Sequence, residues 1–173
     1  MVLMIALASC SKPTPATETA QTPAFDSLGT SNKELVKKYV DALLTGNTAG
    51  MADYLGEGYM GFGPAMKDSV NKQQNLTNWK KSWEEQFSSI KYDEIVSLTP
   101  TIKPETNSRV AGDWVLNWGT VSVVYKNGQP PVKFSLHTAY MVVNGKIARS
   151  HVYYNVADIL GQQGFTFVPP AKK

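Results

Sequence analysis

Apolar side chains recur at helical spacing in two segments of the first half of the chain. The first segment follows Ser31 and Glu34, whose spacing matches a capping box, and it ends near Gly46. Its apolar positions are Leu35, Val36, Tyr39, Val40, Leu43 and Leu44. The second segment covers residues 71–90, with apolar positions at Leu76, Trp79, Trp83 and Phe87. Both patterns predict amphipathic helices, and residues 48–55 are a shorter helical candidate between them.

After Ser88 the pattern changes to an alternation of apolar and polar residues, which is typical of strands. Asn127-Gly128 and Asn144-Gly145 are typical of tight hairpin turns, so the strands that they join are expected to be antiparallel. The expected strands cover residues 59–62, 90–103, 109–126, 131–143 and 146–156. Three helices with one short strand, followed by long hairpins, predict an α+β fold. Its three N-terminal helices would pack on the concave face of a curved antiparallel sheet.

The N-terminal residues have a pattern of their own. The uncharged apolar run in residues 2–9 has the length of a signal-peptide core and is too short to span a bilayer as a helix. Its end, Leu7-Ala8-Ser9-Cys10, resembles the lipobox of bacterial lipoproteins, which implies cleavage before Cys10 and acylation of its thiol. The alternative is a chance apolar N-terminus with a buried cysteine. Residues 11–30 are rich in Pro, Thr and Ala, which indicates a flexible tether.

These segments predict the organisation of the whole chain. Residues 1–9 would be a signal peptide and 10–30 a lipidated cysteine with its tether. Residues 31–168 would be the folded domain and 169–173 a short tail. The expected location is the bacterial cell envelope, with the lipid holding the protein to the periplasmic or surface face of a membrane.

Composition narrows the classes of function. The chain has 173 residues, of which 42% are hydrophobic and 18% charged, a globular profile. Its net charge of +3 and its two arginines, Arg109 and Arg149, give no concentrated basic face, so no nucleic-acid partner is expected. One cysteine excludes an internal disulfide. We find no phosphate-binding loop, dinucleotide fingerprint or cysteine cluster, so neither a cofactor nor a metal site is expected.

The order of elements and one local motif carry a family resemblance. The stretch from Asn144 to Gly164, NGKIARSHVYYNVADILGQQG, resembles the ending of the SnoaL-like branch of the nuclear transport factor 2-like superfamily. The matching positions are Gly145, Lys146, Ile147, Tyr153, Tyr154, Leu160, Gln162 or Gln163, and Gly164. The resemblance implies a cone-shaped sheet around an apolar pocket for a small apolar or aromatic molecule, and a possible homodimer packed through the sheet. Members of the superfamily include polyketide cyclases, steroid isomerases, epoxide hydrolases and many proteins without known catalysis.

Asn155 departs from the pattern of the SnoaL-like cyclases, which have a catalytic carboxylate at this position. An amide can hydrogen-bond but cannot accept and return a proton at ordinary pH, so the acid–base role is not carried over. Asn155 directly precedes a predicted short helix, and Asp158 would lie in the first turn of that helix. Asn155 is therefore expected to be an N-cap. This role does not exclude a contact between Asn155 and a ligand.

His137 and His151 are the candidate catalytic bases, because imidazole titrates near neutral pH. Alternation places His151 on the same strand face as Tyr153 and Asn155, whereas His137 faces away from Phe134 on its own strand. Each histidine could instead lie at a dimer contact or a rim.

Aromatic side chains are numerous for one domain, and a subset is expected to line the pocket together with Asn155. The candidates are Tyr54, Tyr59, Phe62, Trp79, Trp83, Trp114, Trp118, Tyr140 and Tyr153. Three functions follow from the sequence. The first is a membrane-tethered binder of a small apolar molecule without catalysis. The second is an isomerase, cyclase or hydrolase that uses His151 or His137. The third is an envelope module that holds a protein partner through its sheet.

Overall fold

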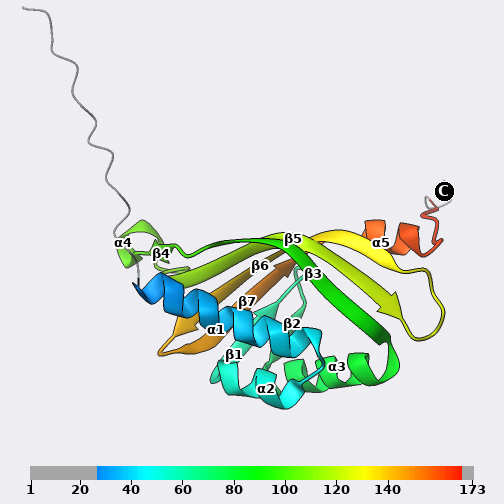
Figure 1. Cartoon of the computed structure of the whole chain (residues 1–173). Coiled ribbons are helices and arrows are strands. Elements are labelled where there is room, and N and C mark those ends of the chain that lie inside the picture. The colour runs from blue at the N-terminus through cyan, green and yellow to red at the C-terminus, as the bar shows by residue number, and fades with distance from the viewer. Residues whose placement is uncertain (1–26, 169–173) are drawn as a thin grey trace, which may run out of the picture.

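The computed structural model describes residues 27–168 (Figure 1). The predicted signal peptide, the lipidation site at Cys10, most of the tether and the tail lie outside the described residues. The described part is a mixed α+β structure with one curved seven-stranded sheet, which confirms the predicted fold class. None of its helices is both long and apolar enough to cross a membrane.

Three helices precede or interrupt the first strands: α1 (Ser27–Leu44), α2 (Thr48–Tyr54) and α3 (Lys72–Glu85). Two more are short: α4 (Pro104–Asn107) and α5 (Val156–Gln162). Since α1 begins at Ser27, Ser31 lies inside the helix and the capping box predicted there is wrong. A capping box does begin α3, where Asn71 accepts from the Gln74 backbone and the Gln74 side chain accepts from the Asn71 backbone.

The predicted helix over residues 71–90 is too long, because α3 ends at Glu85. Phe87 belongs instead to a strand, where it pairs with Tyr125, and Ile90, which also begins a predicted strand, pairs with Val123. Pairing with a long neighbouring strand satisfies this backbone as fully as another helical turn would. The sheet therefore overrides a helical pattern that continues through Phe87.

The sheet contains the strands β1 (Leu55–Phe62), β2 (Ser69–Asn71), β3 (Phe87–Leu98), β4 (Thr101–Ile102), β5 (Gly112–Tyr125), β6 (Val132–Val143) and β7 (Lys146–Tyr153). Their order is β2-β1-β7-β6-β5-β3, and β4 pairs with β5. Both predicted hairpins are present, β5–β6 and β6–β7. The sheet is not wholly antiparallel as predicted, because β1 pairs with β7 in parallel.

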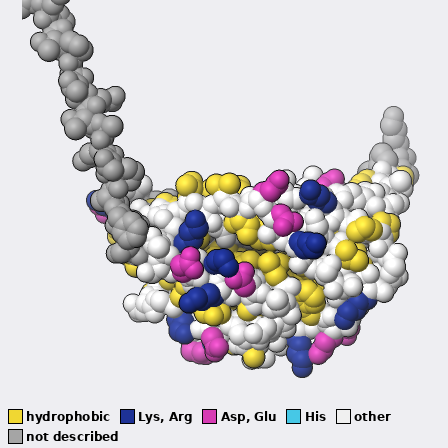
Figure 2. Space-filling model, viewed as in Figure 1, with side chains coloured by type: hydrophobic (Ala, Val, Ile, Leu, Met, Phe, Trp, Pro, Cys, Tyr) yellow, Lys and Arg dark blue, Asp and Glu magenta, His cyan; other side chains and the backbone are white. Residues whose placement is uncertain are grey.

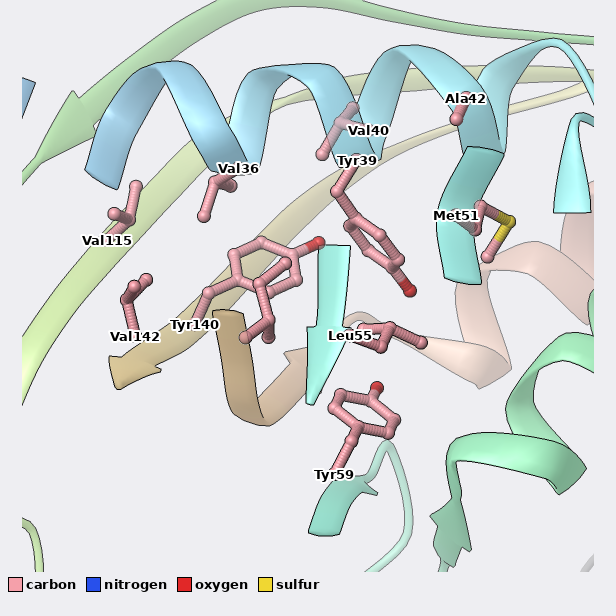
Figure 3. Packing of buried hydrophobic residues seen from close by; sticks show 11 residues of the cluster. Val36, Tyr39, Val40, Ala42, Met51, Leu55, Tyr59, Val115, Tyr140 and Val142 are labelled. Carbon is pink, nitrogen blue, oxygen red and sulfur yellow. The ribbon is translucent and has the colours of Figure 1, made fainter. Parts of the chain in front are cut away.

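The helices cover one face of this sheet (Figure 1). Helix α1 packs on β3 and β5, and α3 packs on β1 and β3, while α2 lies against α1 and α3. The core forms where α1 meets the sheet: Val36, Tyr39 and Val40 point toward Tyr140 and Leu55 (Figure 3). This arrangement agrees with the prediction of N-terminal helices on the concave face.

Candidate functional site

A cavity of about 330 Å³ lies on the helix-covered face, away from the start of α1. Side chains from α1, β3, β5, β6 and α5 line it, among them Leu43, Ile90, Val123, Phe134 and Ile159. Strand alternation explains why these residues meet, since paired residues of neighbouring strands share a face: Ile90 pairs with Val123, and Val121 with Phe134. Figure 2 shows apolar side chains in a furrow between α1 and β3, bordered by charged side chains.

Four tyrosines, Tyr92, Tyr125, Tyr140 and Tyr154, belong to the lining of this cavity. Burial raises the pKa of each phenol above its usual value. The phenols therefore stay protonated around neutral pH and remain able to donate a hydrogen bond. The cavity is an apolar space with neutral hydroxyl groups in its wall.

Only part of the predicted lining reaches this cavity: Trp79 and Tyr140 do. Tyr54 packs against the core instead. The Trp83 indole donates its Nε1–H to the carbonyl of Leu43 at 2.8 Å, which ties α3 to the end of α1. Tyr59 and Phe62 belong to the lining of a second hollow, described below.

The remaining aromatic candidates and both histidines lie on the opposite, convex face of the sheet. In the register of β5, β6 and β7, Trp118 pairs with His137 and His137 with Tyr153. Ring centroids are 4.7 Å apart for Trp118 and His137 and 5.7 Å for His137 and Tyr153. His151 continues the row beside Tyr153, and Phe62 stacks on His151 at 5.0 Å. We call these five residues the convex aromatic row.

This row does not reach the cavity, so the structure does not bring His137 or His151 to it. The His137 Nδ1 lies 3.1 Å from the carbonyl oxygen of Asn117. Burial, with a smaller effect of the nearby Arg149 charge, lowers the pKa of His151. Trp114 lies on the same face but is buried, with its indole N–H donating to the Val110 carbonyl at 2.8 Å. Alternation shows which residues share a face, but it does not identify the concave one.

Asn155 is the N-cap of α5, as its sequence context predicts. Its Oδ1 accepts from the backbone N–H of Asp158 at 3.1 Å, and Asp158 lies in the first turn. The Gln162 side chain bonds both the N–H and the carbonyl of Lys133 at 2.9 Å, which fixes α5 to β6. The exposed Asn155 thus orders a helix that contributes Val156, Ile159 and Leu160 to the cavity wall.

A second hollow of about 310 Å³ lies among β1, β2, α3 and β7. Its lining includes the polar residues Tyr59, Asp68, Asn75, Asn78 and Ser150. It shares Trp79, Val152 and Tyr154 with the apolar cavity. Sequence reasoning missed Asn75, Asn78 and Ser150, because isolated polar residues within a helix or a strand are ordinary surface residues in a sequence pattern.

Among residues 27–168, no group of three or more His, Cys, Asp or Glu side chains is placed to hold a metal ion. The chemistry available in the two hollows is therefore that of phenols, hydroxyls, amides and one carboxylate. These groups can bind and orient a neutral molecule by hydrogen bonds.

Comparisons with known proteins bear on the fold. No protein-family model and no curated protein matches the chain. Among solved structures, a candidate polyketide cyclase from Xanthomonas campestris pv. campestris is 19% identical, with a TM-score of 0.62 over 79% of this chain and 98% of that one. An LEH-like epoxide hydrolase of M. tuberculosis is 16% identical, with a TM-score of 0.58 over 78% and 85% of the two chains.

A third similar structure, from Catenulispora acidiphila, is described as having a ketosteroid isomerase-like fold and was solved in complex with trimethylamine. It is 16% identical, with a TM-score of 0.59 over 79% of this chain and 98% of that one. Identities this low establish architecture and not activity. Together with the curved sheet and the helices on its concave face, they identify the fold of this chain as nuclear transport factor 2-like.

Proposed function

We propose that this protein is a membrane-tethered domain of the bacterial cell envelope that binds a small, largely apolar molecule without transforming it. The observation that carries the proposal is the cavity of about 330 Å³ between α1, α5 and the sheet, with its aliphatic and aromatic lining. Pockets for small organic ligands have this volume and character. The tether and the lipid at Cys10 come from the sequence pattern.

Two features support binding over catalysis. The titratable side chains of the cavity lining are phenols whose pKa values burial raises, which suits hydrogen bonding better than proton exchange near neutral pH. At the position of the SnoaL-like carboxylate, Asn155 caps α5. The similar structure that holds trimethylamine supports small-molecule binding by this fold.

Filling the cavity tests the proposal. The purified protein would be titrated with N-phenyl-1-naphthylamine, whose fluorescence rises in apolar surroundings. Ile90 lines the cavity, and an Ile90→Trp variant should weaken binding by at least about tenfold, because the indole occupies the space. Val124→Trp is the matched control, since Val124 lies on an exposed strand position outside the cavity lining. Equal affinity of both variants and the original protein would refute the cavity as the binding site.

The convex aromatic row favours a second role for the other face of the sheet. Trp118 and Tyr153 are 40% and 53% exposed, and Val96 and Leu98 extend the apolar surface at 61% and 56%. Large exposed apolar side chains on adjoining strands are typical of an interface. We infer that a second copy of the chain covers them, as the family resemblance implies.

The oligomeric state tests this interface. The original protein should sediment as a dimer at micromolar concentration, and Trp118→Lys should sediment as a monomer, because a buried lysine without a partner charge opposes association. Met66→Lys is the control, since Met66 is fully exposed in the β1–β2 loop. A monomeric original protein would end the dimer proposal and leave the cavity proposal intact.

A further inference from the structure

Two polar side chains of the second hollow, those of Tyr59 and Asn75, are buried and held in place by hydrogen bonds, as in a preorganised binding site. Tyr59 is only 2% exposed, and its phenol oxygen lies 2.6 Å from Ser150 Oγ. Asn75 is 7% exposed and donates its Nδ2–H to the phenol of Tyr39 at 3.2 Å. Tyr39 and Tyr59 approach each other from α1 and β1 on either side of Leu55 (Figure 3). Groups held in this way are positioned before any ligand arrives.

Gly61 leaves space beside the hydroxyl groups of Tyr59 and Ser150. A Cβ on Gly61 would lie 2.6 Å from the Tyr59 phenol oxygen and 3.2 Å from Ser150 Oγ. Any other residue at this position would therefore crowd the two hydroxyls. One hydrogen bond between two hydroxyls uses one of their two protons, so the pair retains the capacity to donate and to accept.

The charge of the lining indicates which polar group the hollow would accept. Asp68 is its carboxylate, held by a 3.1 Å bond from the Ala65 N–H, and the lining contains no Lys or Arg among the described residues. Burial and, to a smaller extent, the Asp68 charge raise the pKa of Tyr154, so the Asp68 charge is felt where the two hollows meet. A ligand carboxylate would be repelled, whereas an uncharged hydroxyl or amide would be accommodated.

The two hollows are neighbours. Trp79, Val152 and Tyr154 line both of them, so the two hollows meet at these side chains. One hollow is apolar and the other is polar. An elongated molecule that filled both would have to be apolar along most of its length and polar at one end.

We propose that the ligand is an amphiphile with an uncharged hydroxyl- or amide-bearing end, its apolar part in the cavity and its polar end in the hollow of Tyr59, Asn75, Asn78 and Ser150. This inference rests on the proposed function, because it adds a second compartment to the same binding site. It specifies the class of ligand, which the apolar cavity alone leaves open.

Competition among ligands of equal chain length tests the inference. N-phenyl-1-naphthylamine would be displaced with 1-chlorooctane, octan-1-ol, octanamide and octanoate. Octanamide and octan-1-ol should displace the probe at roughly fivefold lower concentration than 1-chlorooctane, the factor expected of one net hydrogen bond. Octanoate should be the weakest of the three polar ligands, and Asp68→Asn should improve octanoate selectively.

A matched pair of variants locates the effect. Asn78→Leu replaces a polar lining residue on the exposed side of α3 and should remove the advantage of octanamide over 1-chlorooctane. Thr77→Leu also replaces an exposed polar residue of α3 by leucine, one position away and outside both linings, and should retain that advantage. Probe binding with equal displacement by all four ligands would overturn the amphiphile inference and leave the proposed function standing. Failure of the probe to bind the original protein would overturn both.

Discussion

The environment of His151 makes the stability of the folded protein depend on pH. Burial and the Arg149 charge lower the pKa of His151 in the folded protein below the usual 6.5, so the folded state favours the neutral imidazole. Below about pH 6.5 the unfolded chain then binds more protons than the folded one. The contribution of His151 to the free energy of unfolding is complete above that pH and is lost as the pH falls through the lower, folded pKa.

Urea unfolding at pH 7.5 and pH 5.5 measures this contribution. The original protein should lose more stability on acidification than His151→Gln does, because glutamine does not titrate in this range. His151→Gln also loses the ring stacking on Phe62 at every pH, so the informative quantity is the change in the free energy of unfolding between the two pH values. Equal changes in both proteins would show that the imidazole has the same pKa in the folded and unfolded chains.

Helix α5 is the element whose anchoring matters most for the cavity. Its N-terminal end depends on the bond from the Asp158 N–H to Asn155, and its far end depends on Gln162 and Lys133. Asn155→Ala should lower the free energy of unfolding by about 1 kcal/mol and weaken probe binding, because it removes the cap of a helix in the cavity wall. Asn155→Asp should retain both properties, since aspartate is an equally good N-cap. Thermal unfolding and the fluorescence titration measure the two effects, and equal losses in Ala and Asp variants would contradict the capping role.

The sequence allows the helices and strands to be predicted better than which face of the sheet each side chain occupies. The α5 cap, both hairpins and the helical stripe of α1 follow from local residue patterns, and the structure contains all three. The end of α3 does not follow from local patterns. Phe87 fits a helical face and a strand equally well until its strand partner Tyr125 is known. Which face of the sheet is concave depends on helix packing across the whole chain, so local patterns leave the position of Trp118 and His151 undetermined.

For the described part of the molecule, the cavity and the start of α1 lie toward different ends. Helix α1 starts beside α4, whereas α5 lies at the opposite end of the sheet (Figure 1). The apolar cavity is bordered by Leu43 and Leu44 near the end of α1 and by residues of α5. A lipid attached to the chain before α1 would therefore be joined to the described part at the end opposite the cavity, and the proposed flexible tether would leave the cavity accessible from the aqueous phase.

Fractionation of bacteria that express the full chain tests this arrangement. The protein should be recovered with the membranes and should carry acyl chains detectable by mass spectrometry, because two or more chains give stable anchoring. Cys10→Ser should move it to the soluble fraction without changing probe affinity, since the cavity is built from residues of the folded part. Ser11→Ala is the control and should remain in the membranes. A Cys10→Ser variant that stays membrane-bound would refute lipidation as the anchor, and a change in its probe affinity would show that the N-terminal segment takes part in binding.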